Sequence, residues 1–210
     1  MYTPAHFRMP PDDLGDFLDR VHKGNLITVD PSNGRLAATF LPWAFVNNDR
    51  LTTHLGRVNV QSGHAGQALV ILMGDDAYVS EEWLGDGSAP SWNYETVQIR
   101  GELVIHTDPD WIYQSWRELL DRFSNSQLDD YDPVWLEGQA RACVGAEVRI
   151  SEVEAKSKLS QNLTEAVVQS VADHLTPTCP ALAERMRQVS LPYIAARQAR
   201  VRAAKPYHLD

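Results

Sequence analysis

The chain of 210 residues has a net charge of −9, with 43% hydrophobic and 22% charged residues. This composition suits one main packed domain with helical additions and excludes extensive disorder. The purest apolar run covers only residues 68–73, far short of the ~20 residues that cross a bilayer, and the N-terminus lacks the charged start of a signal peptide. We therefore expect a soluble cytoplasmic protein.

The first half of the chain has the pattern of a small antiparallel sheet. Residues 11–24 predict a helix with one apolar face. Short segments of strand character follow, separated by turns rather than by crossover helices. We expect these strands at residues 25–29, 36–40, 51–55 after a turn at 47–49, 68–73, 77–80 and, after a loop at 85–90, 94–106. Hairpin connections of this kind favour a mainly β barrel with peripheral helices.

The second half alternates between helices and one strand. Asp108 and Pro109 form a strong helix start, with Trp116, Leu120 and Phe123 as the apolar stripe of that helix. A short helix is expected at residues 134–140 and a strand at 144–153. Two helices at residues 164–174 and 181–204 complete the chain, the second interrupted at Pro192.

The acidic charge is unevenly distributed along the chain. Residues 180–210 hold six basic side chains against two acidic ones. We therefore divide the chain into a domain of residues 1–175 and a basic helical arm of residues 176–210. The arm could contact DNA or clamp an acidic partner subunit, and we favour the clamp, because the acidic body argues against a surface dedicated to nucleic acid.

Several classes of site are not indicated by the sequence. Cys143 and Cys179 show no CxxC spacing, and the seven histidines are scattered without an HExxH pattern, so we predict neither disulfides nor a metal site. The motifs GxSxG, GxxxxGK[ST] and GxGxxG are missing, which argues against serine hydrolases, P-loop enzymes and Rossmann proteins.

Three polar segments are candidates for ligand binding. The segment from Lys156 to Asn162 places Lys156, Lys158, Ser160 and Asn162 on one face if it is extended, which would suit an anion. The alternative interpretation is a solvated strand end that caps the next helix.

The second candidate is the segment 52–59, which carries Thr53, His54, Arg57 and Asn59. Arg57 could bind a phosphate in bidentate fashion, although ordinary loop polarity explains the segment equally well. The third candidate is Trp92 with Asn93, which could stack against a planar ring and bond to it. Aromatic residues at strand starts are more often core or interface.

Taken together, these segments resemble the PaiB-type FMN-binding negative transcriptional regulators. The resemblance runs from Met1 to about His174 and keeps the order of five blocks. These blocks are residues 38–43, 54–59, 77–80, 92–94 and 158–162.

The resemblance implies an antiparallel split β-barrel, a homodimer, and FMN bound near the subunit interface. It implies that Thr39, His54, Arg57 and Asn59 line the phosphate and ribityl side of the flavin. Lys158, Ser160, Gln161 and Asn162 would close the site from the same or the partner chain. The chain departs from the family pattern in three places. Phe40 occupies a position where the family usually has His, residues 60–62 replace Pro-x-Trp, and Leu163 occupies a position where the family usually has Arg.

The resemblance also implies that the protein acts as a ligand-responsive negative regulator. A flavin-dependent oxidoreductase acting on a small molecule is the alternative, because split barrels commonly hold FMN for hydride or electron transfer. A third interpretation, prompted by the three departures, is a family member that has lost its ligand or exchanged it, for example for haem.

Overall fold

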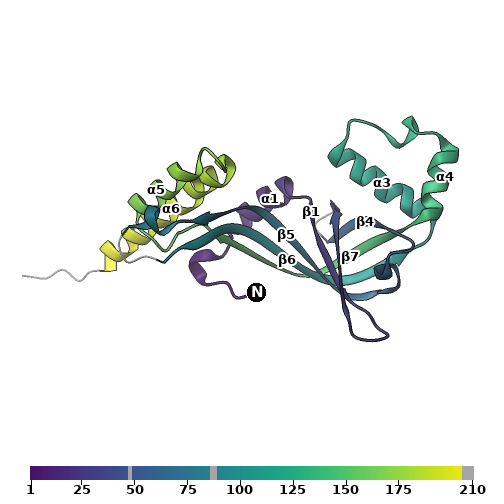
Figure 1. Ribbon diagram of the computed structural model, residues 1–210, viewed down its shortest axis with the longest axis horizontal. Helices are drawn as coiled ribbons and strands as arrows, with labels where there is room; N and C mark the ends of the chain where they lie inside the picture. Colours follow the sequence, from purple (N-terminus) through teal and green to yellow (C-terminus); the bar gives the residue numbers. More distant parts are fainter. Residues whose placement is uncertain (47–48, 86–88, 205–210) are drawn as a thin grey trace, which may run out of the picture. The chain divides into compact units, whose positions relative to one another are not determined.

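The computed structural model describes residues 1–46, 49–85 and 89–204, so parts of the predicted turn at 47–49 and loop at 85–90 lie outside the described residues. Within these ranges, seven strands form one antiparallel sheet in the order β2-β1-β5-β6-β7-β4-β3 (Figure 1). The strands are β1 (Lys23–Val29), β2 (Leu36–Pro42), β3 (Ala44–Val46), β4 (Arg50–Gly56), β5 (Gly66–Val79), β6 (Ser91–His106) and β7 (Cys143–Lys158).

Six α-helices and three short 3-10 helices accompany the sheet in the described part of the chain. They are η1 (Ala5–Phe7), α1 (Pro11–Arg20), η2 (Val60–Gly63), α2 (Glu81–Leu84), α3 (Pro109–Phe123), η3 (Leu128–Asp130), α4 (Pro133–Ala142), α5 (Glu165–Leu175) and α6 (Pro180–Ala204). The side chain of Asp108 caps α3, and Pro109 occupies its first turn, as the sequence predicts. Over the same ranges, no helix is long and apolar enough to span a bilayer.

The chain divides into two compact units, and the long strands β5, β6 and β7 contribute to both. Unit 1 comprises residues 1–13, 73–96 and 155–210, and unit 2 comprises residues 14–72 and 97–154. In unit 1, α5 and α6 lie side by side (Figure 1). Their buried faces pack with Val79, Leu84 and Leu159 in one apolar core.

Unit 2 holds the strand pairs that carry several of the predicted site residues. In this unit β1 pairs with both β2 and β5, and β4 pairs with β3 and β7. The helix α3 packs on β3 and β4 and also contacts α4. Trp43, fully buried, donates from Nε1 to the carbonyl of Gly24 at 3.4 Å. The antiparallel sheet with peripheral helices confirms the predicted fold class.

Several predicted boundaries are wrong. Gly24 lies inside β1 instead of ending a helix, because β5 passes so close that a Cβ there would lie 2.2 Å from the carbonyl oxygen of Ile71. The strands predicted at 68–73 and 77–80 form one strand, β5. Pro192 does not interrupt α6, since Ser190 and Ile194 are buried on either side of it and packing holds the helix together.

Candidate functional site

The end of β7 and the start of β6 bring polar and aromatic groups together in unit 1. We call Ser91, Trp92, Asn93, Lys158 and Ser160 the Lys158 cluster. Lys158 donates from Nζ to Ser91 Oγ and to the carbonyl oxygen of Trp92, each at 2.5 Å. An ammonium has three N–H donors, so one has no hydrogen-bond partner in the described part of the chain and is available to a ligand. Burial and the nearby Lys156 lower the pKa of Lys158, and an anion here would offset both effects.

A tight turn after β7 positions the remaining polar groups of this cluster. Ser160 has φ of 69°, a left-handed conformation that non-glycine residues seldom adopt. Its Oγ accepts from the amide of Asn93 at 3.0 Å. The side chain of Gln161 spans the turn, accepting from Leu159 N at 2.8 Å and donating to Ser157 O at 2.6 Å.

The alternation of side chains expected of an extended segment at residues 156–162 therefore holds only for Lys156 and Lys158. Both lie in β7, whereas Ser160, Gln161 and Asn162 belong to the turn that follows. Asn162 is exposed, whereas Gln161 is buried. The alternative interpretation, a solvated strand end, does not fit Lys156, which is 9% exposed, or Ser157, which is fully buried.

Trp92 offers a flat aromatic surface beside Lys158. The ring is 48% exposed, and its Nε1 donates to Asp76 Oδ1 at 2.7 Å, which fixes its orientation. Tyr78 meets it edge-on, with ring centroids 5.9 Å apart. An exposed indole held in one orientation can stack against a planar ligand.

A second group of predicted residues lies in unit 2, where Asn59 and Arg57 are both fixed by hydrogen bonds. Asn59 donates from Nδ2 to Thr39 Oγ1 at 3.1 Å and caps η2 through its Oδ1. Arg57 donates to the carbonyl oxygens of Arg141 and Cys143, both at 2.8 Å. A guanidinium has five N–H donors, so three have no hydrogen-bond partner among the described residues, on a side chain whose orientation is already set.

Thr53 and His54 are neighbours on β4 and therefore point to opposite faces of the sheet. Thr53 is fully buried, and its Oγ1 has no hydrogen-bond partner within the described residues. His54 Nδ1 is likewise buried without a partner there, and burial lowers the pKa of its ring. The structure thus separates these two predicted residues, while it joins Thr39 to Asn59.

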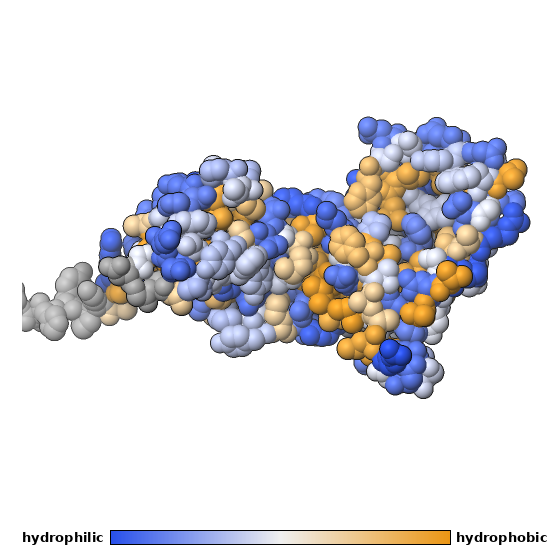
Figure 2. Space-filling view, in the orientation of Figure 1, coloured by the Kyte–Doolittle hydropathy of each residue, from blue (hydrophilic) through white to orange (hydrophobic). Residues whose placement is uncertain are grey.

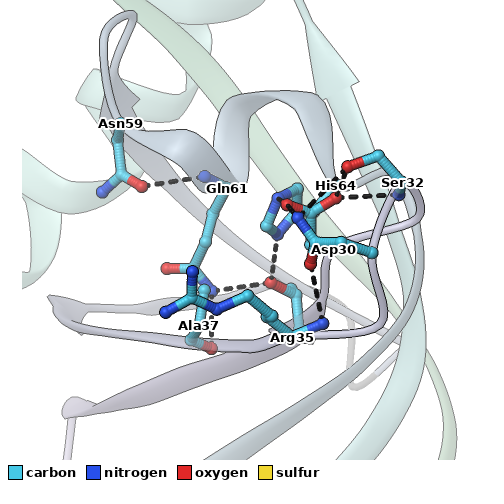
Figure 3. A network of polar contacts seen from close by, with 9 residues as sticks. Asp30, Ser32, Arg35, Ala37, Asn59, Gln61 and His64 are labelled. Atoms are coloured by element: carbon cyan, nitrogen blue, oxygen red, sulfur yellow. Dashed lines mark hydrogen bonds and ion pairs between the residues drawn. The ribbon is translucent and has the colours of Figure 1, made fainter.

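A buried polar network holds the loop that carries Arg57 and Asn59 (Figure 3). Gln61 donates from Nε2 to Thr28 Oγ1 at 3.0 Å and to the carbonyl oxygens of Leu26 and Ala37 at 3.1 and 3.3 Å. Thr28 also bonds to His64 Nδ1 at 2.9 Å. Gln61 was not predicted from the sequence, because a polar residue in a turn gives no signal that its side chain is buried.

Each of these two groups offers donors of the kind that bind phosphate or hydroxyl groups. Within the described ranges, Lys158 and Arg57 have N–H donors without a hydrogen-bond partner, and Thr53 has a buried hydroxyl without one. The sequence also matches the family described as "Putative FMN-binding domain" over residues 1–152. The chain belongs to this FMN-binding family. FMN is thus the cofactor that family membership assigns, as the resemblance implied.

A relative of this family member is the "Protease synthase and sporulation protein PAI 2" of Bacillus subtilis strain 168. The two are 25% identical over 202 residues, which cover 89% of this chain and 96% of the relative. The alignment reaches beyond residue 152, where the family match ends, so the similarity includes sequence outside the family model.

Solved structures confirm the split-barrel fold of this FMN-binding family member. A conserved hypothetical protein of Mycobacterium tuberculosis has a TM-score of 0.60 at 14% identity, over 79% of this chain and 95% of that chain. The FAD and haem binding protein of Mycobacterium smegmatis has a TM-score of 0.54 at 18% identity, over 71% of each chain.

Proposed function

We propose that the chain is a cytoplasmic FMN-binding homodimer that acts as a ligand-responsive negative regulator. The proposal that the chain binds FMN rests mainly on Lys158. Its ammonium is partly desolvated, has one N–H donor without a partner in the described ranges, and lies beside the exposed indole of Trp92. Asn93, Ser160, Gln161 and Asn162 are proposed as members of the Lys158 side, which contacts the phosphate. Thr39, Thr53, Arg57 and Asn59 are proposed as a second set, for the ribityl chain, whereas the resemblance implied that the set with His54 and Arg57 lines both the phosphate and the ribityl chain. When bound, FMN would supply a redox-active ring that accepts one or two electrons.

The edge strand β2 supports the homodimer. Leu36 and Phe40 lie on one face of it and are 75% and 63% exposed. Val29, the cross-strand partner of Leu36, is 50% exposed. Apolar side chains gathered on an exposed strand face are typical of a protein contact, and a second copy of the chain is the partner we propose.

Sedimentation velocity tests the dimer directly. The wild-type chain is expected to sediment as a dimer at micromolar concentration, and Phe40→Asp as a monomer, because the variant would bury an unpaired carboxylate in the contact. Val201→Asp, at an exposed position on α6, is the control and should remain dimeric. A wild-type chain that is monomeric at every concentration would contradict the proposal.

The regulatory output is proposed from the family resemblance, and the hydrogen bonds and ion pairs of α6 bear on how the protein would act. Three of the arginines of the basic arm bond within their own unit: Arg185 to Glu95 and Asp13, Arg187 to Asp173, and Arg197 to the carbonyl oxygens of Gln161 and Leu163. These guanidinium groups stabilise unit 1. We therefore propose regulation through a protein contact that changes with the flavin, with DNA binding by the arm as the competing interpretation.

A mobility-shift assay at increasing salt separates these outputs. A DNA-binding arm would shift mixed-sequence duplexes at low salt and lose affinity steeply as salt rises. The proposal predicts no shift. A salt-dependent shift that Arg200→Gln with Arg202→Gln abolishes would instead assign regulation to direct DNA contact.

The flavin-dependent oxidoreductase remains the second candidate, supported by the exposed ring of Trp92 beside Lys158, where a flavin could react with a substrate. Anaerobic mixing of the FMN-loaded protein with NADPH or NADH distinguishes it from a regulator. Rapid bleaching of the flavin absorbance, followed by turnover with an added electron acceptor, would favour the enzyme. A flavin that is reduced no faster than free FMN favours the regulator.

A further inference from the structure

Unit 2 contains an apolar cavity of about 350 Å³. Its wall is formed by β4, by the inner faces of α3 and α4, and by the segment that joins these helices. Leu119, Leu120 and Phe123 of α3 face Trp135 and Leu136 of α4. Hydrophobic side chains also reach the surface in the region of these helices (Figure 2). A mostly apolar cavity of this size is typical of a small-molecule site.

Two polar atoms in the cavity wall are buried without a hydrogen-bond partner in the described part of the chain. They are Nδ1 of His54 and Nε1 of Trp116. The two rings meet edge-on, with centroids 6.1 Å apart. A buried N–H left unpaired costs free energy, which an acceptor atom of a ligand would recover.

The electrostatics of the cavity favour a neutral ligand. Burial lowers the pKa of His54, which favours the uncharged imidazole. The remaining wall is almost entirely apolar and would not compensate an ionised group.

The rim of the cavity adds a preference for a flat molecule. Tyr131 and Trp135 stack at the rim, with ring centroids 5.6 Å apart and planes at 19°. Both rings are partly exposed, at 36% and 51%. Aromatic faces on the rim together with Trp116 inside the cavity suit a planar aromatic ligand.

We propose that this cavity binds a neutral, planar aromatic molecule of two or three rings that carries a hydrogen-bond acceptor, and that the Trp116 N–H donates to it. None of the residues proposed above for FMN lines this cavity, and the proposal does not depend on the FMN site. It assigns His54 to the aromatic ligand, whereas the resemblance implied a flavin contact for that residue.

The matched probes 9-fluorenone and fluorene test the proposal, because they share a planar three-ring shape and differ in one carbonyl. Calorimetric titration of the full chain should show saturable binding of fluorenone, about tenfold tighter than fluorene. Trp116→Phe should remove this preference and keep the fluorene affinity. Gln139→Trp, which fills the cavity from an exposed position on α4, should abolish binding of both probes, and Gln114→Trp on α3, outside the cavity, should leave it unchanged.

Three results would overturn the proposal. Equal affinity of the wild-type chain for both probes would show that Trp116 donates no hydrogen bond to the ligand. Failure of either probe to saturate would show that the cavity is not a binding site. Competition between fluorenone and FMN would show that the cavity is part of the flavin site, and titration of the FMN-saturated chain measures this directly.

Discussion

Gln61 donates from Nε2 to the hydroxyl of Thr28 at 3.0 Å, in a position where neither side chain is accessible to solvent. Gln61 stands in the segment where the PaiB-type pattern has Pro-x-Trp. Val60 stands at the proline position of that pattern, so a less rigid loop is expected, because proline restricts the backbone and valine does not. The structure instead fixes the loop through side-chain hydrogen bonds to β1 and β2.

Replacing Gln61 should therefore destabilise unit 2. Gln61→Leu removes the two N–H donors of Nε2, which serve three acceptors between them. At ~1 kcal/mol for each donor, we expect a loss of about 2 kcal/mol in the free energy of unfolding. Urea denaturation followed by tryptophan fluorescence measures it. Ser62→Ala, at the neighbouring position, is the control and should change the free energy of unfolding by less than about 1 kcal/mol. Equal stability of Gln61→Leu and wild type would show that the network does not fix the loop.

The ion pair between Arg185 and Glu95 should stabilise unit 1 strongly. Arg185 Nη2 lies 3.1 Å from Glu95 Oε1, and Glu95 is only 2% exposed. Arg185→Met would leave a buried carboxylate without this partner and should cost roughly 3–5 kcal/mol. Arg187→Met removes a more exposed pair with Asp173 and should cost less than about 1 kcal/mol. Similar losses for both variants in denaturant titrations would contradict the structural role of Arg185.

The stability of the protein should depend on the protonation of His54. Burial lowers the pKa of His54 in the folded chain below 6.5. The unfolded chain therefore takes up the proton first, and stability should fall as the pH drops below 6.5 towards the folded pKa. His54→Gln should show a weaker fall. Because the pKa of His22 is also lowered, the test is the difference between wild type and variant in unfolding free energy across this pH range, and no difference would contradict it.

The strands and helices were largely predictable, because hydrophobic periodicity and caps act locally. Thr164 caps α5 and Asp108 caps α3, and both helices begin where the sequence predicts. The failures lie where distant segments decide the outcome. The sequence predicts a helix end at Gly24, yet this residue lies in a strand, at a position beside Ile71 where only glycine fits.

The candidate site was predictable as a set of residue types but not as a geometry. The sequence indicates hydroxyl and cationic groups at 52–59 and 156–162. It does not indicate that Thr53 and His54 face opposite sides of β4, or that Ser160 adopts a left-handed turn. The apolar stripe of α3 was expected, but the stripe alone cannot show that Trp116 faces a cavity, since that depends on how α4 packs.

Binding of FMN should raise the pKa of Lys158. In the structure, burial and Lys156 lower this pKa, and a bound phosphate would stabilise the charged ammonium. Titration of the Lys158 side-chain resonances by NMR, with and without FMN, measures the change. A pKa that stays the same when the flavin binds would place the phosphate elsewhere.

The most direct test of the FMN proposal is calorimetric titration of the flavin-free protein with FMN and with riboflavin, which lacks the phosphate. Wild type should bind FMN more tightly than riboflavin. Lys158→Met should lose roughly 10- to 100-fold in FMN affinity, from ~1.5–3 kcal/mol for a charged hydrogen bond, and keep its riboflavin affinity, while Lys23→Met at an exposed position behaves as wild type. A Lys158→Met protein that binds FMN as tightly as wild type would contradict the account.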